Sequence, residues 1–170
     1  VVTVDTVDLF WAFGGENFDG EKFVAQASGR GAVGAMGEEG WKGTTPKTFA
    51  LIRVPDTLAG YQNLAANYRR SLPLKVIVIT GSNGKTSVKT LLLGILQGAD
   101  QGHAANAYAN PGNRNNEIGL PLAVLDAPED AQYAIYEMGH GQPGHIAHRT
   151  HTVPPAVARP PTNPPPAPHT

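Results

Sequence analysis

The stretch from residue 76 to residue 87 is the feature that most constrains the fold of this chain. It reads Val-Ile-Val-Ile-Thr-Gly-Ser-Asn-Gly-Lys-Thr-Ser, an apolar β-branched run that breaks into a glycine-rich loop. A continuous apolar run is typical of a buried parallel strand, because both faces of such a strand are covered. Residues 88–97 then have the pattern of a helix. The stretch therefore predicts a strand, a tight loop and a helix.

The loop contains the residue types of a phosphate-binding cradle. Its glycines let backbone N–H groups converge on an anion, and a helix beginning near Lys85 adds its positive N-terminal end. In such loops the lysine reaches the β- and γ-phosphates and the adjacent hydroxyl, here Thr86, binds magnesium. Ile79 stands where the strict pattern has a glycine, so a plain glycine-rich turn is the alternative. The residues predicted to bind the nucleotide are Gly81, Ser82, Asn83, Gly84, Lys85, Thr86 and Ser87.

A second buried strand is expected over 134–138, and it ends in Glu137-Met138-Gly139. Strands that alternate with helices imply a parallel sheet, in which ligands lie beyond the carboxyl ends of the strands. Glu137 and Thr86 would then lie on one edge. We therefore interpret Glu137 as a site residue, against the alternative of an ordinary carboxylate at a strand end.

The rest of the chain suggests a division into three parts. Residues 1–72 are expected to form a small α/β domain, 73–149 a partial central domain, and 150–170 a tail. Eight of the 15 prolines lie in 151–170, so we expect this tail to be extended and mostly disordered. The fold class is thus α/β, with a small N-terminal domain, an incomplete parallel-sheet domain and a proline-rich tail.

Within these parts we expect strands over 9–13 and 49–54, a helix over 21–28 capped by Asp19, an exposed loop over 37–47, and a helix over 118–125 with Pro121 in its first turn. A further helix over 56–70 is expected to bury five side chains. These are Leu58, Tyr61, Leu64, Ala65 and Tyr68.

Composition excludes several classes of protein. A net charge of −1 argues against a nucleic-acid binder that uses a broad basic surface. The absence of cysteine excludes disulfides and thiolate metal sites. No apolar stretch is long enough for a membrane helix, so we expect no membrane insertion and a cytoplasmic location.

Three motifs in order resemble those of the Mur ligases, and in particular the MurF type. Thr80–Ser87 matches the nucleotide motif of the family. The run 112–121, Gly-Asn-Arg-Asn-Asn-Glu-Ile-Gly-Leu-Pro, and the segment Glu137-Met138-Gly139 with 143–146 match two further motifs. Gly-Glu-Asn-Phe-Asp-Gly at 15–20 is similar to the uridine-nucleotide-binding domain. The resemblance covers about residues 5–149 and departs from the family at His145, where glutamate is usual, and before residue 5, where an Asp-Ser-Arg element is missing.

The resemblance implies a P-loop ATPase domain and ATP-driven amide bond formation. The γ-phosphate of ATP would pass to the carboxylate of UDP-MurNAc-tripeptide, and the amine of D-alanyl-D-alanine would attack the acyl phosphate. Lys85 would supply positive charge, while Thr86 and Glu137 would bind Mg²⁺. Asn113, Asn115 and Asn116 would orient substrate, and Asp19 with Gly20 would contact the uridine nucleotide; turn formation is the alternative for both sets.

Two other hypotheses remain at this point. The chain could come from another ligase with the same cradle, such as a folylpolyglutamate or cyanophycin synthetase. It could also be a non-catalytic fragment that binds nucleotide, because the resemblance stops inside the central domain. We expect the chain as given to lack full ligase turnover.

Overall fold

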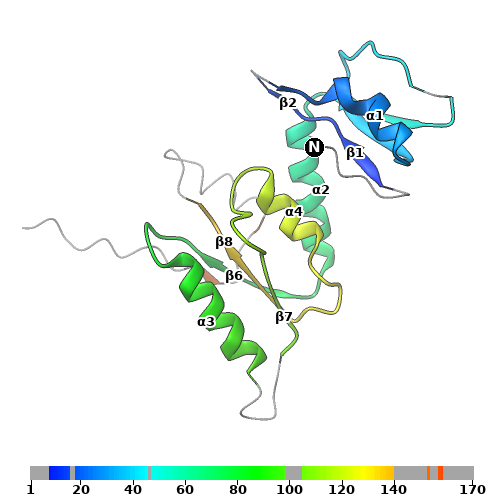
Figure 1. Ribbon diagram of the computed structural model, residues 1–170. Coiled ribbons are helices and arrows are strands. Elements are labelled where there is room, and N and C mark those ends of the chain that lie inside the picture. The colour runs from blue at the N-terminus through cyan, green and yellow to red at the C-terminus, as the bar shows by residue number, and fades with distance from the viewer. Residues whose placement is uncertain are drawn as a thin grey trace, which may run out of the picture. The chain divides into compact units, whose positions relative to one another are not determined.

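The computed structural model describes residues 8–15, 18–45, 47–98, 105–139, 153 and 157–158. The chain divides into two compact units, Val1–Leu64 and Ala65–Thr170. Each unit contains a parallel β-sheet with helices, which confirms the predicted α/β class (Figure 1). The assignment of domains to residues 1–72, 73–149 and 150–170 stays a prediction.

The first unit is built on a three-stranded parallel sheet of order β1-β4-β5. Its strands are β1 (Leu9–Trp11), β4 (Gly34–Glu38) and β5 (Ala50–Val54). A short antiparallel pair, β2 (Gly14–Gly15) with β3 (Phe18–Asp19), precedes the 3-10 helix η1 (Gly20–Phe23) and helix α1 (Val24–Gly29). One face of the sheet packs on α1 through a cluster of mostly small side chains. The buried members are Ala12, Val24, Ala27, Ala32, Ala35 and Phe49.

Two expectations for this unit need correction. The helix expected over 21–28 is split, because Asp19 caps a 3-10 turn through its bond to the Glu21 N–H and the α-helix begins only at Val24. The loop expected over 37–47 begins later, because Gly37 and Glu38 complete β4 and pair with β5. The cap itself is confirmed.

Helix α2 (Thr57–Ser71) lies one residue later than the predicted 56–70, because Asp56 precedes the helix and its carboxylate accepts a bond from the Ala59 N–H. Its first turns pack Tyr61 against Trp11, with ring centroids 5.0 Å apart. Ala65 is fully buried, but Leu64 is 45% exposed. The expected burial of Leu64 was wrong, since the small residues at 65 and 66 form the packed face instead.

The second unit contains a four-stranded, all-parallel sheet of order β7-β8-β6-β9. Its strands are β6 (Lys75–Ile79), β7 (Ala107–Ala109), β8 (Tyr133–Glu137) and β9 (Val157–Ala158). The strand predicted from the apolar run is thus central, with a partner on each side. β9 lies within the segment expected to be a disordered tail. It is an edge strand of the sheet, and prolines are tolerated beside edge strands. The rest of 150–170, apart from the buried Val153, lies outside the described residues.

Two helices cover this sheet from opposite sides (Figure 1). Helix α4 (Gly119–Leu125), with Pro121 in its first turn as expected, packs Leu120 and Val124 on Val76 and Tyr136. Helix α3 (Lys85–Gln97) contacts β6, β7 and β8. Because side chains alternate along a strand, Glu137 and Tyr136 point to different faces. The α3 side therefore carries Glu137.

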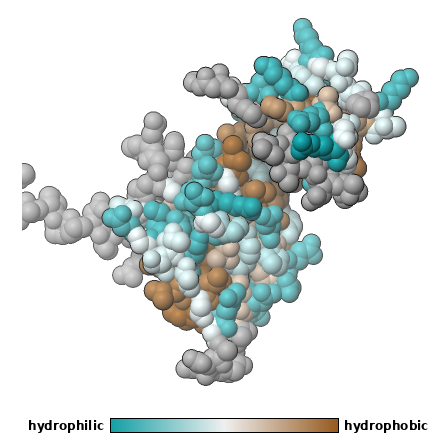
Figure 2. Space-filling model, viewed as in Figure 1, coloured by the Kyte–Doolittle hydropathy of each residue, from teal (hydrophilic) through white to brown (hydrophobic). Residues whose placement is uncertain are grey.

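The outer face of α3 is apolar. Val88, Leu91 and Ile95 follow each other at helical spacing and are 50%, 67% and 74% exposed. Figure 2 shows hydrophobic side chains gathered over this helix. No helix in the described part of the chain has the length and apolar character needed to cross a membrane.

Candidate functional site

The loop between β6 and α3 has the backbone of an anion cradle. Gly81 and Gly84 have φ values of +150° and +75°, which residues with a side chain rarely adopt. Gly84 is the N-cap of α3, so the N–H groups of the first helical turn open toward the loop. The glycines thus occupy the two positions where the turn needs them. Ser82 and Asn83 lie exposed at the tip, and Ser87 lies exposed in the first turn of the helix.

Lys85 closes this loop on itself. Its ammonium donates to the carbonyl oxygen of Gly81 at 2.7 Å and lies 3.5 Å from that of Ser82. Among the residues that the structure describes, it forms no ion pair. Lys85 is therefore a cation beside converging N–H groups, with no carboxylate among the described residues to neutralise it, which suits a phosphate ligand.

Glu137, at the end of β8, is only 4% exposed and is surrounded by donors. The Thr86 hydroxyl donates to its Oε2 at 3.0 Å, and Asn115 Nδ2 donates to its Oε1 at 3.3 Å. The backbone N–H of Glu137 donates to Asn110 Oδ1 at 2.8 Å. The predicted meeting of Thr86 and Glu137 at one sheet edge is thus confirmed.

Sequence reasoning missed Lys89, whose side chain is buried in this site. Lys89 is 6% exposed, and its Nζ lies 3.4 Å from Glu137 Oε2. It also donates to the carbonyl oxygens of Asn110 at 2.8 Å and of Gly112 at 3.0 Å. Breaking such a buried pair typically costs about 3–5 kcal/mol. The signal in the sequence was its spacing, four residues after Lys85 and so on the same helical face.

The asparagines after β7 have different structural roles. Asn110, also missed, is buried and donates from Nδ2 to the Arg114 carbonyl at 3.0 Å. Asn115 reaches Glu137, as described above. Asn116 lies just before α4, and its Oδ1 accepts from the N–H groups of Ile118 at 3.2 Å and Gly119 at 2.6 Å. Asn113 is exposed in a turn, with its carbonyl accepting from the Asn115 N–H at 2.7 Å. Of the three predicted substrate asparagines, the structure therefore brings Asn115 to the carboxylate.

Asp19 and Gly20 belong to the first unit, and both have clear structural roles there. Asp19 caps η1 and pairs with Lys22 at 3.4 Å on the surface. Gly20 is buried, and a Cβ at this position would lie 2.6 Å from the carbonyl oxygen of Phe13. The turn interpretation explains both residues without a ligand, so their contact with a uridine nucleotide stays a prediction.

The residues at the carboxyl edge of the β7-β8-β6-β9 sheet fit a magnesium–nucleotide group. Mg²⁺ in nucleotide sites commonly takes one or two protein oxygens together with phosphate oxygens and waters. Thr86 and Glu137 bring a hydroxyl and a carboxylate together, directly beside the start of α3. Within the described ranges, no group of three or more His, Cys, Asp or Glu side chains gathers at a possible metal site. His140, His145 and His148, which the sequence favours as part of a solvated loop over a metal cluster, lie outside those ranges.

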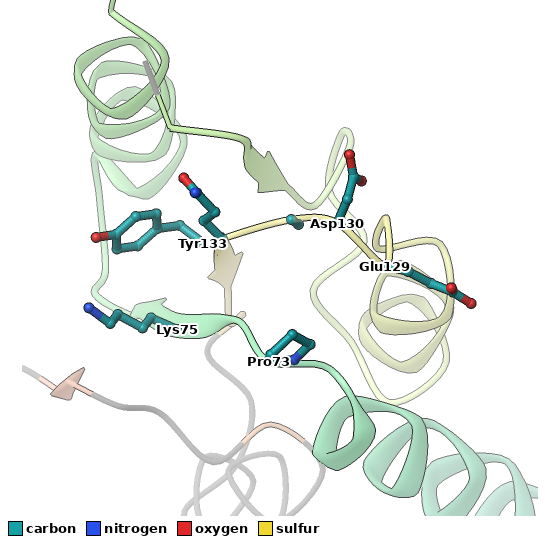
Figure 3. A pocket seen from close by; sticks show the side chains of 7 residues that line it. Pro73, Lys75, Glu129, Asp130 and Tyr133 are labelled. Atoms are coloured by element: carbon teal, nitrogen blue, oxygen red, sulfur yellow. The ribbon is translucent and has the colours of Figure 1, made fainter. Parts of the chain in front are cut away.

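A cavity of about 350 Å³ lies at the opposite, amino-terminal edge of the same sheet (Figure 3). Lys75 and Tyr133 begin β6 and β8 there, and the Lys75 ammonium lies 5.7 Å from the centre of the Tyr133 ring. The loop before β8 adds two carboxylates, which disfavour a phosphate ligand. We therefore place the candidate site at the carboxyl edge. The cavity is lined by Pro73, Lys75, Glu129, Asp130, Ala131, Gln132 and Tyr133.

Comparison with known proteins agrees with this geometry. Residues 79–159 match the Mur ligase middle domain. The chain is 40% identical over 138 residues to the UDP-N-acetylmuramoyl-tripeptide–D-alanyl-D-alanine ligase of Bacillus subtilis, an alignment that covers 81% of this chain and 29% of that protein. The chain spans about 30% of the length of the curated relatives it matches.

Two solved structures share the fold. A UDP-N-acetylmuramoylalanyl-D-glutamyl-2,6-diaminopimelate–D-alanyl-D-alanyl ligase from Acinetobacter baumannii is 33% identical, with a TM-score of 0.77 over 89% of this chain and 34% of that one. MurF ligase from Thermotoga maritima, solved in complex with ADP, is 30% identical, with a TM-score of 0.74 and the same coverage. The sequence motifs, the parallel sheets and these likenesses agree, and the chain belongs to the Mur ligase family, among its MurF-type members.

Proposed function

We propose that this chain carries the nucleotide site of an ATP-dependent ligase that joins D-alanyl-D-alanine to UDP-MurNAc-tripeptide. The observation that carries the proposal is the hydrogen bond between Thr86 and Glu137 beside the glycine loop. It brings the two candidate magnesium ligands together at the N-terminal end of α3, the helix that begins with Lys85. The likeness to MurF-type ligases supplies the substrates.

In the proposed reaction, the protein contributes mainly charge and alignment. The N–H groups of the 81–85 loop and the Lys85 ammonium would hold the β- and γ-phosphates of ATP. Lys85 would exchange its bond to the Gly81 carbonyl for bonds to phosphate oxygens. Mg²⁺, when bound by Thr86 and Glu137, would neutralise charge on those oxygens.

The reacting groups would be those of the two peptide substrates. The tripeptide carboxylate would take the γ-phosphoryl group, with ADP leaving, and the amine of D-alanyl-D-alanine would then displace phosphate to form the amide. Asn115, already bonded to Glu137, is well placed to orient a group near the transferred phosphate. Contacts from Asn113, Asn116, Asp19 and Gly20 to substrate are part of the proposal.

The test begins with nucleotide binding to this chain. Calorimetric titration with ATP in the presence of Mg²⁺ should show binding that is lost when Lys85 is replaced by alanine. Phosphate release and amide product are then measured with both peptide substrates. Release that depends on Lys85 and on the tripeptide substrate supports the ligase. Nucleotide binding without release would limit this chain to a binding role, and no binding at all would contradict the proposed site.

A further inference from the structure

The buried Lys89 has more partners than a simple ion pair needs. It lies on the same face of α3 as Lys85, one turn further along the helix. Its three contacts, to the carbonyls of Asn110 and Gly112 and to the carboxylate of Glu137, match the three N–H donors of an ammonium group. Two of the three partners belong to one loop. Lys89 thus joins α3 to the loop that follows β7.

That loop, residues 110–116, is also bonded to β8 from its other side. Asn110 accepts from the Glu137 N–H, and Asn115 donates to the Glu137 carboxylate. The Gly139 N–H donates to the carbonyl of Asn115 at 3.1 Å. The loop, called the asparagine loop below, is therefore held between α3 and the end of β8.

A role in fold stability alone does not account for this arrangement. Replacing a buried ion pair with apolar side chains is often neutral or stabilising, so a buried ion pair contributes little net stability to the fold. The carbonyls of Asn110 and Gly112 belong to irregular backbone, and irregular backbone near the interior needs donors from elsewhere. Gly112 has a φ of +54°, a conformation that favours glycine. Lys89 supplies the donors that fix this turn relative to the helix.

We propose that Lys89 is a positioning residue that couples the asparagine loop to the nucleotide-binding end of α3. Lys85 and Thr86 begin the helix, and Lys89 connects the next turn of that helix to the loop that carries Asn113, Asn115 and Asn116. Ordering of the first turn by a nucleotide would then also order the loop. This second step rests on the proposed nucleotide site, whereas the tether itself rests on contacts within the chain.

Hydrogen exchange of the unliganded chain tests the tether. Lys89→Met keeps the length of the side chain and removes its three donors. Amides of the asparagine loop should exchange at least about tenfold faster in this variant, while those of β6 and β8 keep their protection. Lys75→Met, which removes a lysine at the opposite edge of the same sheet, should leave the loop unchanged. Equal acceleration throughout the second unit, or none in the loop, would overturn the proposal.

Exchange with ADP and Mg²⁺ present tests the coupling. Nucleotide should slow exchange of the asparagine loop in the unaltered chain, and Lys89→Met should lose most of that slowing even at saturating ADP. Equal slowing in both proteins would refute the coupling. If the unaltered chain does not bind ADP, the proposed function fails, but the comparison without ligand still decides whether Lys89 tethers the loop.

A double variant covers the case in which Lys89→Met does not fold because Glu137 is left unpaired. Lys89→Met with Glu137→Gln removes both charges together and avoids a lone buried ion. Its loop should exchange fast, whereas Glu137→Gln alone, which keeps the bonds from Lys89 to the two carbonyls, should keep the loop protected. Fast exchange in both would assign the effect to Glu137 and contradict the role of Lys89.

Discussion

The hydroxyl of Thr86 donates a 3.0 Å hydrogen bond to the carboxylate of Glu137, 51 residues later in the chain. The two residues meet because β6 and β8 are parallel neighbours, with Ile79 paired to Glu137, so their carboxyl ends lie at one edge. The glycine loop then turns α3 back over that edge. A hydroxyl and a carboxylate that are far apart in sequence thereby form one oxygen-rich corner of the site.

Thr86→Val should weaken magnesium-dependent nucleotide binding. Valine keeps the shape of the side chain but removes the oxygen, and a hydrogen bond to a charged group is typically worth about 1.5–3 kcal/mol. We expect the affinity for ATP with Mg²⁺ to fall by about tenfold or more, while the affinity for ATP with EDTA changes little. Calorimetric titration under the two conditions measures both values.

Thr90→Val is the matched control for this change. Thr90 lies one turn further along α3, is exposed, and bonds to the Thr86 carbonyl within the helix. It should bind ATP as the unaltered chain does in both conditions. A similar loss in both variants would mean that the effect comes from the helix and not from the Thr86 oxygen.

Lys85→Ala should reduce nucleotide affinity with or without Mg²⁺. The Lys85 ammonium lies beside the loop and has neutral carbonyl partners, so phosphate would gain a charge-assisted bond there. Losing such a bond corresponds to roughly 10- to 100-fold weaker binding. Lys75→Ala, at the opposite edge of the sheet, should bind nucleotide normally. Unchanged affinity in Lys85→Ala would contradict the cradle.

The sequence predicted the parts of the site that depend on local pattern. A β-branched run, two glycines and a Lys-Thr pair specify a strand, a turn and a helix start, and the structure has β6, the positive-φ glycines and α3 in those places. The proximity of Thr86 and Glu137 also followed from local signals, because parallel strands bring their carboxyl ends together.

What the sequence did not reveal depends on tertiary contacts. A lysine on an amphipathic helix usually belongs to the solvated face, so the spacing of Lys89 from Lys85 was too weak a signal to predict its burial. Ala-Tyr-Ala at 107–109 is too short and too weakly β-forming to predict β7. Because β7 was not predicted, the position of Asn110 directly after this strand could not be predicted either. Leu64 was misjudged because periodicity cannot tell which apolar face of a helix is covered.

Gly84→Ala should destabilise the second unit, whereas Gly94→Ala should stabilise it. Gly84 has a φ of +75°, where a side chain costs about 1–2 kcal/mol even though a Cβ there meets no atom of the described residues within 4 Å. Gly94 lies exposed within α3, also with open space around it, and alanine in a helix is favoured over glycine by about 0.5–1 kcal/mol. Urea unfolding of both variants measures the difference. Equal effects would contradict the left-handed N-cap.

Two tyrosines on the α4 side of the sheet link stability to alkaline pH. Burial, with the nearby charge of Asp126, raises the pKa of Tyr108 to about 12, although Arg114 acts in the opposite direction. Burial also raises the pKa of Tyr136, with Tyr108 adding to the shift. Their ring centroids are 6.2 Å apart, and neither hydroxyl has a hydrogen-bond partner within the described residues.

The free energy of unfolding should therefore fall as the pH rises above about 10, where tyrosines in the unfolded chain ionise. The folded chain keeps the Tyr108 proton up to a pH of about 12, so ionisation between these values favours the unfolded state. Tyr108→Phe removes this contribution, and urea unfolding at a series of pH values should show a shallower decline above pH 10. At pH 7 the variant should be about as stable as the unaltered chain, because the hydroxyl has no hydrogen bond to lose among the described residues. An unchanged slope above pH 10, or a large loss at pH 7, would show that the Tyr108 hydroxyl is solvated or bonded instead.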